Sequence, residues 1–262
     1  MSGAAMRVGR MTERIIHGRR YLQFARLAEL DGLVHAFSTR GCDMSTRGGA
    51  GAAQRTANRA AFVGDWGLDV QRLCWCEQVH RPQLTVIDRP ITDGPRRLAG
   101  CDAVISRVAG QPLMAFSADC PLVLVYAPRV GAVGIAHASW RCTVAQITRR
   151  LVETLIDLAG AEPSAMLAGI GPSAGPERYE VGEDVCTAAA GLPERERLFP
   201  RRNGRMFFDL WLANRLQLRA AGLQEENIAT AGLCTIGAAG MFYSYRREGA
   251  GCGHFALLAA VR

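Results

Sequence analysis

Two strongly apolar segments near the middle of the chain, Leu122–Ala127 and Ala132–Ala136, constrain the fold more than any other feature. Both are rich in aliphatic and β-branched residues, which favour strands. A short turn signal, Pro128-Arg129, separates them. We therefore predict two paired strands at the centre of a sheet. Similar composition predicts further strands at Leu33–Ser38, Leu84–Ile87 and Ala103–Ser106.

Apolar residues at helical spacing follow the predicted strand Ala132–Ala136. After Thr143, which we expect to cap the helix N-terminus, apolar residues recur every three or four positions as far as Gly160. A second helix is expected to start after Asp209 and to end before Gly222. Within Gly169–Gly175 the spaced glycines indicate a loop. Strands and helices in this irregular order predict an α/β or α+β layered fold rather than a regular βαβ array.

The length of 262 residues, of which 49% are apolar, suits one large domain or two small ones. Residues 1–20 are basic and lack a periodic apolar pattern, so we predict a flexible extension followed by a single domain over residues 21–262. The sequence has no run of about 18 apolar residues, and residues 1–20 lack the continuous apolar core of a secretory signal peptide. We therefore predict a cytoplasmic protein without a membrane segment. Nine scattered cysteines, an odd number, predict reduced thiols.

All 31 basic side chains are arginines, because the sequence contains no lysine. The missing primary amine excludes a Walker-A phosphate loop, a kinase-type lysine and a pyridoxal or aldolase Schiff base. The net charge of +7 comes from scattered arginines rather than from a basic stripe, so we expect no nucleic-acid surface. Any anion must therefore be bound by arginine, backbone amides or a metal.

Three side chains near the ends of apolar segments could form a metal site: His80, Cys120 and His137. Two imidazoles and one thiolate suit a borderline-soft metal such as zinc, with the fourth tetrahedral position left for water or substrate. The three are far apart in sequence, so only folding can bring them together. Core histidines with a buried thiol would explain the same residues, as would a Cys120 nucleophile activated by His137. Cys74 and Cys76, which would share one strand face near His80, form an alternative metal site or a buried strand.

A series of short motifs resembles those of the laccase-domain family, and they occur in that family's order between residues 33 and 257. Members of the family are variously called multicopper polyphenol oxidase-like proteins, purine nucleoside phosphorylases and peptidoglycan editing factors. The motifs are His35–Arg40, Gln78–His80, Ala118–Pro121, Ala136–Arg141, Gly169–Ser173, Tyr179–Gly182, Asp209–Asn214 and Phe242–Arg247.

The resemblance implies an α+β fold, a single-domain α-β-β-α-type sandwich with mixed sheets. It also implies that His80, Cys120 and His137 hold zinc, with copper as the other metal to consider. Arg40, in the Ser-Thr-Arg motif, becomes the expected phosphate binder, because a guanidinium meets phosphate oxygens through two hydrogen bonds.

Further site residues are expected from the same motifs. Besides Arg40 and Cys120, Asp119 is a candidate catalytic residue that could assist proton transfer, although a turn or capping role fits it equally. Asp102 could orient a metal-bound histidine. Candidate substrate-binding residues are Arg40, Gln78, Arg141 and Arg246.

The activity implied by the resemblance is phosphorolysis of adenosine, inosine or methylthioadenosine, together with deamination of adenosine. The partners would then be a purine nucleoside and phosphate, with no nucleic acid or membrane, and the protein would be a monomer or a homodimer. Three alternatives stay open: a peptidoglycan editing factor acting on wall precursors, a copper polyphenol oxidase, and a metal-stabilised scaffold without turnover.

The sequence departs from the family pattern around the expected site. Ser139 and Cys142 stand where the family has glycines, so a loop that needed positive φ would take another shape here. We therefore expect the metal ligands to be preserved better than the pocket walls. The other departures are Arg81, Glu177, Arg178 and His254.

Overall fold

The two central strands form as expected. In the computed structural model, which describes residues 7–8 and 11–262, Leu122–Ala127 (β10) pairs antiparallel with Ala132–His137 (β11) through a turn at Pro128–Val130. Every residue of both strands is buried. The other three predicted strands are also confirmed with the expected bounds, as Leu33–Ser38 (β4), Leu84–Ile87 (β6) and Ala103–Ser106 (β8).

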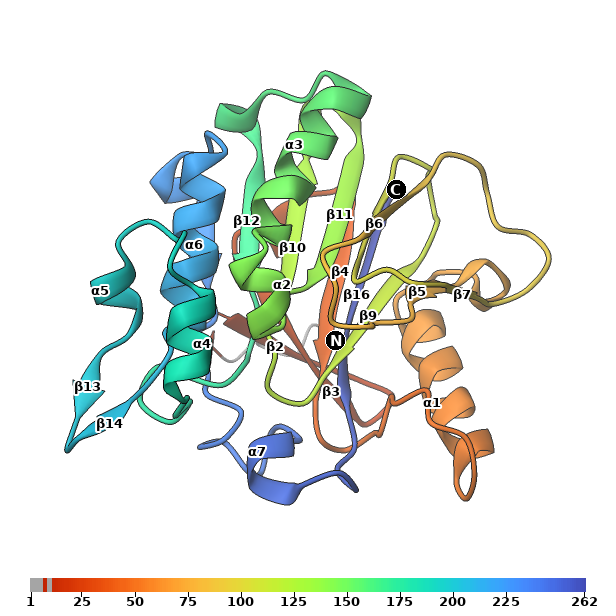
Figure 1. Cartoon of the computed structure of the whole chain (residues 1–262). Helices are drawn as coiled ribbons and strands as arrows, with labels where there is room; N and C mark the ends of the chain where they lie inside the picture. Colours follow the sequence, from red (N-terminus) through yellow and green to blue (C-terminus); the bar gives the residue numbers. More distant parts are fainter. Residues whose placement is uncertain (1–6, 9–10) are drawn as a thin grey trace.

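The strands form two mixed sheets (Figure 1). The large sheet has the order β1-β2-β3-β4-β16-β9-β5-β7, and the small sheet has the order β15-β12-β10-β11-β8-β6. Arg201–Arg202 (β13) and Arg205–Met206 (β14) form a separate hairpin. The remaining strands are Arg7–Val8 (β1), Met11–Ile16 (β2), Arg19–Phe24 (β3), Cys74–Cys76 (β5), Arg96–Leu98 (β7), Leu113–Ser117 (β9), Leu167–Ile170 (β12), Ile228–Thr230 (β15) and Phe255–Val261 (β16).

The main core lies between the two sheets, where their inner faces share one apolar cluster. Gly169 shows how closely the sheets approach: a Cβ there would lie 2.1 Å from the Phe24 ring. The expected loop over Gly169–Gly175 is therefore wrong at its start, since Gly169 belongs to β12. A glycine in this strand leaves room for the ring of the facing sheet, which periodicity alone does not reveal.

Helices cover the two outer faces and complete the predicted α-β-β-α sandwich (Figure 1). Ile147–Ala159 (α3) and Leu210–Ala220 (α6) pack on the small sheet, while Ala52–Asp65 (α1) packs on the large sheet. The shorter helices are Trp140–Val144 (α2), Glu183–Ala188 (α4), Arg195–Leu198 (α5) and Tyr245–Glu248 (α7).

The expected cap at Thr143 is wrong. Thr143 lies inside α2, where its hydroxyl donates to the carbonyl of Ala138, and Gln146 with φ 59° separates α2 from α3. Apolar spacing continues across this break although Val144 of α2 packs near α6 and Ile147 of α3 packs on the small sheet. The other helix ends are confirmed: Gly160 ends α3 in the left-handed conformation, and Asp209 caps α6 by accepting from the Leu212 amide at 2.9 Å.

The expected boundary at residue 21 does not coincide with a structural one. Met11–Ile16 and Arg19–Phe24 pair as a hairpin, and β3 joins β4 of the large sheet. Asp65 at the end of α1 accepts hydrogen bonds from Arg19 and Tyr21, which fastens the hairpin to the helix. The segment is basic because this hairpin carries exposed arginines such as Arg14 and Arg20. The rest of the expected extension, residues 1–6 and 9–10, lies outside the described residues.

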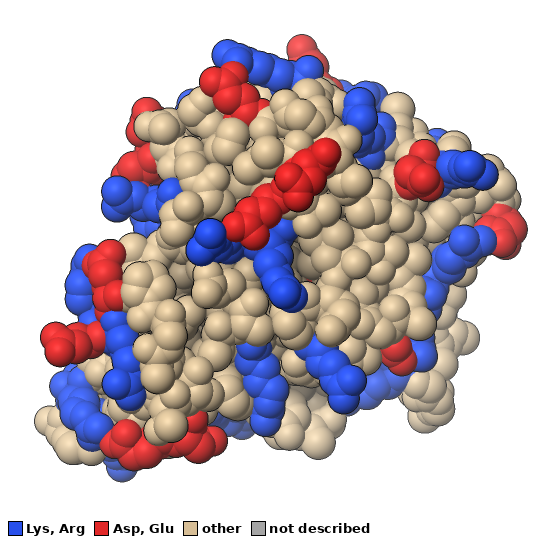
Figure 2. All heavy atoms as spheres, turned by 45° about the horizontal axis from the view of Figure 1, so that its top comes forward, with Lys and Arg blue, Asp and Glu red and all other residues tan. Residues whose placement is uncertain are grey.

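The surface carries arginines among acidic side chains on the face that Figure 2 shows, where no continuous basic stripe occurs. No helix among the described residues is long and apolar enough to cross a bilayer.

Candidate metal centre

The candidate site lies at one edge of the small sheet. Because β10 and β11 are antiparallel with Leu122 opposite His137, the start of β10 and the end of β11 meet at this edge. The pairing of Ala103 with Ala136 brings the start of β8 there, and β6 runs parallel to β8 from Leu84. Residues just before β6, β8 and β10 therefore meet the last residue of β11.

This edge brings together the three predicted ligands. Their donor atoms, from His80, Cys120 and His137, all lie within 4.8 Å of one another. The imidazoles of His80 and His137 meet edge to face with ring centroids 4.9 Å apart. Tetrahedral zinc with ordinary bond lengths spaces its donors by about 3.5 Å, so modest side-chain rotation suffices for ligation. Within the described part of the chain this is the one such cluster, and Cys74 and Cys76 do not join it.

Asp102 holds the site from behind. Its buried carboxylate contacts His137 Nδ1 at 2.8 Å and accepts from the backbone amides of Val79, His80 and Arg81 at 2.8, 3.1 and 3.2 Å. The first contact leaves His137 Nε2 as the ligand atom, as in carboxylate–histidine–zinc arrangements. The other three fix the loop that carries His80. The orienting role expected for Asp102 matches this geometry.

Electrostatics distinguishes the two histidines. Burial of His137 works against its charged form, but the Cys120 sulfur and the carboxylate of Asp102 outweigh this effect and raise its pKa to about 9. Burial and the neighbouring charge of His137 lower the pKa of His80. A metal ion that bound between these groups would displace a proton from them, as is usual for imidazole and thiol ligands. The donor set therefore fits zinc.

The loops that deliver the ligands adopt uncommon backbone conformations. Positive φ angles occur at Gln78 (62°), His80 (57°) and Asp119 (119°), none of which is glycine. Such conformations cost free energy and persist where surrounding contacts hold them, often at functional sites. Here the amides around His80 are held by Asp102, and the side chain of Asp119 is held by three donors.

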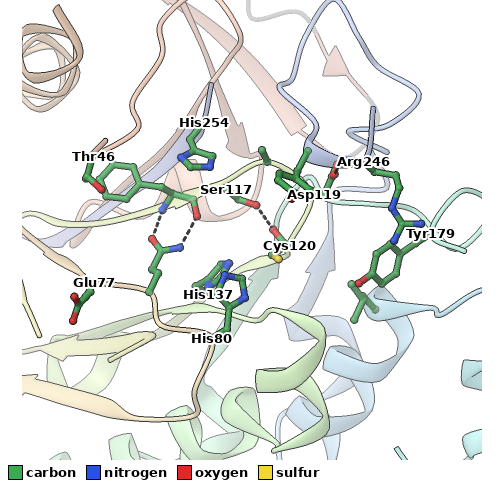
Figure 3. A pocket seen from close by; sticks show the side chains of 15 residues that line it. Thr46, Glu77, His80, Ser117, Asp119, Cys120, His137, Tyr179, Arg246 and His254 are labelled. Atoms are coloured by element: carbon green, nitrogen blue, oxygen red, sulfur yellow. Dashed lines mark hydrogen bonds between the residues drawn. The ribbon is translucent and has the colours of Figure 1, made fainter. Parts of the chain in front are cut away.

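A cavity of about 580 Å³ opens beside the three ligands, where the edges of the two sheets face each other. This volume is typical of pockets that bind small molecules. Figure 3 shows His80, His137 and Cys120 together on one wall, with Tyr179 and Arg246 on one side and Thr46 and His254 on the other. The lining residues are Thr46, Glu77, Gln78, His80, Phe116, Ser117, Ala118, Asp119, Cys120, His137, Tyr179, Leu210, Tyr245, Arg246 and His254.

Two predicted site residues, Gln78 and Asp119, form hydrogen bonds within the protein at the cavity wall. Gln78 closes a pair of hydrogen bonds with the backbone of Phe116, both 2.7 Å long. Asp119 accepts from Thr235, Ser244 and the amide of Arg246 at 2.6, 3.1 and 2.7 Å. Burial raises the pKa of Asp119 against these bonds. Both side chains therefore shape the cavity, and their catalytic or substrate-binding roles stay predictions.

The predicted arginines occupy different places. Arg246 lines the cavity, stacks over the Tyr179 ring at 5.0 Å and donates to the carbonyl of Glu180. Arg40 and Arg141 are not among the described lining residues. The guanidinium of Arg40 pairs with Glu248 at 2.6 Å, and that of Arg141 lies over the Trp140 ring at 4.3 Å. Geometry therefore offers Arg246, rather than Arg40, to an anion in the cavity.

Several lining residues escape prediction from the sequence. Thr46 lies in a loop, and Phe116 looks like any apolar residue of a strand. Tyr179 lies in one of the family-like motifs, but its spacing does not indicate a cavity wall. His254 stands out only as a departure from the family pattern.

The departures from the glycine pattern cause no backbone strain. Ser139 has φ −54° and caps α2 by accepting from the amide of Cys142 at 3.3 Å. Cys142 lies within α2 and is fully buried in the core on the outer face of the small sheet. Neither position adopts the left-handed conformation that favours glycine. The loop after His137 therefore becomes a capped helix start.

Comparison with known proteins places the chain in a family. The family model described as multi-copper polyphenol oxidoreductase laccase matches residues 29–262. A purine nucleoside phosphorylase of Deinococcus radiodurans is 36% identical over 229 residues, covering 82% of this chain and 83% of the relative. A protein named adenosine deaminase RL5, from an unknown prokaryotic organism, is 30% identical over 255 residues, covering 88% and 94%.

The fold also matches solved structures. The crystal structure of YlmD from Geobacillus stearothermophilus superposes with a TM-score of 0.84 at 26% identity, covering 92% of this chain and 96% of that one. That of a hypothetical protein YfiH from Bacillus licheniformis gives the same TM-score at 24% identity, covering 95% and 99%. The resemblance of the motifs is thus confirmed, and the chain belongs to the multi-copper polyphenol oxidoreductase laccase family.

Proposed function

We propose that this chain is a zinc-dependent purine nucleoside enzyme that cleaves adenosine, inosine and methylthioadenosine by phosphorolysis and also deaminates adenosine. The observation that carries the proposal is the convergence of His80, Cys120 and His137 on the wall of a cavity that also contains Arg246. The relative from Deinococcus radiodurans is named a purine nucleoside phosphorylase and RL5 an adenosine deaminase, and these names support the same pair of reactions.

The chemistry follows from the two sides of the cavity. In phosphorolysis a phosphate oxygen forms a bond to the anomeric carbon of ribose while the bond from that carbon to the purine nitrogen breaks. One guanidinium nitrogen of Arg246 donates to the Glu180 carbonyl, so the other N–H groups can orient phosphate. His80, Cys120 and His137 would hold the zinc, which supplies Lewis acidity at the cavity wall when bound. Asp102 keeps His137 oriented.

The first experiment incubates purified protein with adenosine or inosine, with and without phosphate, and separates the products by chromatography. We expect free base and ribose 1-phosphate only in the presence of phosphate, and inosine from adenosine in its absence. Nucleosides that remain unchanged in every sample contradict the proposal. Cys120→Ala should abolish both reactions, while Cys42→Ala, which removes a thiol outside the cavity, should change neither.

The metal is tested separately from turnover. Metal analysis should find one zinc per chain, and X-ray anomalous scattering should place it between the two imidazoles and the Cys120 sulfur. Copper at this position, with oxidation of phenols, would instead support the polyphenol oxidase alternative. The single cluster of potential ligands in the described residues favours one ion over several coppers.

A second candidate rests on the order Cys120, His137, Asp102. A thiol beside an imidazole that a carboxylate orients is also the arrangement of cysteine hydrolases, which suits an amidase-like peptidoglycan editing role. Treatment with a zinc chelator separates the two candidates, because only the zinc enzyme should lose activity. A deletion strain with normal muropeptide composition would count against the editing role.

The setting of the protein is also proposed. We expect it to work in the cytoplasm as a monomer or a homodimer, which cell fractionation and light scattering would test.

A further inference from the structure

Several polar groups that line the cavity are already paired within the protein. Gln78 is closed on the backbone of Phe116, and Asp119 accepts three hydrogen bonds. Glu77 accepts from the Arg97 guanidinium at 2.6 Å and from a backbone amide. By contrast, the imidazole of His254 makes no hydrogen bond to any other described residue. Its ring faces the cavity from the wall opposite His80 and His137 (Figure 3).

The fold holds His254 firmly by its backbone. Its amide donates to Asp43 Oδ1 at 2.9 Å, and its carbonyl accepts from the Met44 amide at 2.9 Å. The next residue, Phe255, starts β16 inside the large sheet and is fully buried. A side chain that is free of protein partners on such a rigid support is suited to bind a ligand.

The cavity has a cationic side and a neutral side. Arg246 with Tyr179 forms the first. Thr46 and His254 contribute to the second, on the other side of Cys120 in Figure 3, where the charge of the Glu77 carboxylate is balanced by Arg97. During phosphorolysis the incoming phosphate and the leaving base lie on opposite faces of the anomeric carbon. If phosphate takes the side of Arg246, the uncharged purine faces His254. The purine edge farthest from the sugar carries the substituent at position 6.

Resting on the proposed function, we propose that His254 is the specificity-determining residue that hydrogen-bonds the 6-substituent of the purine. A neutral imidazole has one donor and one acceptor nitrogen, and its two tautomers exchange these roles. It can therefore accept from the 6-amino group of adenosine or donate to the 6-oxo group of inosine. His254 thus allows one cavity to take both nucleosides.

The surroundings of His254 keep the imidazole neutral. Burial and the nearby positive charge of Arg47 lower its pKa to about 4, although the carboxylate of Asp43 opposes this effect. At neutral pH the ring therefore keeps an acceptor as well as a donor. A protonated ring would have two donors and would favour the 6-oxo group alone.

The test measures binding to the zinc-loaded protein by calorimetry. The probes are 9-deazaadenosine and 9-deazainosine, whose carbon–carbon glycosidic bonds resist phosphorolysis, together with 9-deazapurine riboside, which lacks the 6-substituent. In His254→Leu, affinity for the first two should fall by about tenfold or more, while affinity for the third stays unchanged. His254→Arg, which offers only donors, should lose the 6-amino analogue selectively. His254→Gln, which offers both roles, should restore both.

Controls and outcomes separate this inference from the proposed function. His17→Leu removes an exposed imidazole outside the cavity and should bind as wild type, and thermal unfolding checks that each variant is folded. Equal binding of all three analogues by His254→Leu and wild type overturns the inference even if wild type turns over nucleosides. Analogue binding that depends on His254, without turnover by wild type, upholds the inference and overturns the proposed function. No binding by wild type overturns both.

Discussion

Replacing Asp102 by asparagine should weaken both metal binding and folding. The carboxylate serves four donors at once: the ring of His137 and the amides of Val79, His80 and Arg81. An asparagine keeps one oxygen and has an NH₂ group in place of the second oxygen. The donors that bonded to the second oxygen then face another donor. About two of the four hydrogen bonds should therefore be lost.

The size of the effect follows from the burial of the site. Hydrogen bonds to charged groups contribute roughly 1.5–3 kcal/mol each, so losing two should lower the free energy of unfolding by about 4 kcal/mol. Removing the carboxylate that orients a metal-bound histidine should lower zinc affinity by about 10-fold to 100-fold. The loss should exceed that expected from destabilisation alone, because Asp102 fixes two of the three ligands.

The assay titrates zinc against a chelating dye at neutral pH and follows urea unfolding of the metal-free protein in parallel. Asp65→Asn is the matched control, since that carboxylate also accepts from several side chains, including Arg19 and Tyr21, but fastens α1 to the N-terminal hairpin. We expect this control to be destabilised with unchanged zinc affinity. Wild-type zinc affinity in Asp102→Asn would refute the role given to the carboxylate.

Three further predictions concern the metal, pH and packing. Cys120→Ser should lose most zinc affinity, measured by the same dye competition, because a hydroxyl is a poor substitute for a thiolate. Burial lowers the pKa of His35 to about 3. The stability that this neutral ring contributes above pH 6.5 is therefore lost as the pH falls from 6.5 toward 3, by about 1.4 kcal/mol per pH unit. His35→Gln should accordingly flatten the pH dependence of urea unfolding between about pH 6.5 and 4.5, and an unchanged slope would contradict this account. Gly169→Ala should lower the free energy of unfolding by about 3 kcal/mol or repack the core, because its Cβ would lie 2.1 Å from the Phe24 ring; an unaffected thermal midpoint would show that the sheets can separate there.

Strands were predictable where local composition and burial agree. β10 and β11 are buried on both faces, so they read as continuous apolar runs bounded by a turn. The N-terminal hairpin escaped prediction because its exposed face carries arginines and its burial depends on β4 and α1. Thr143 was misread because apolar residues recur at helical spacing on both sides of Gln146, whose left-handed conformation breaks the helix.

The sequence by itself determined the types of ligand available to a metal and, through its lack of lysine, that anions must meet arginine, backbone amides or metal. It also determined the central strands, because strand formation depends on neighbouring residues. Only the tertiary structure decided that His80, Cys120 and His137 converge and that Arg246 rather than Arg40 lines the cavity. Those outcomes depend on the register of β8, β10 and β11 and on a partner for Arg40, Glu248, that lies 208 residues away. Contacts across such separations are set by how the sheets pack, which no local pattern encodes.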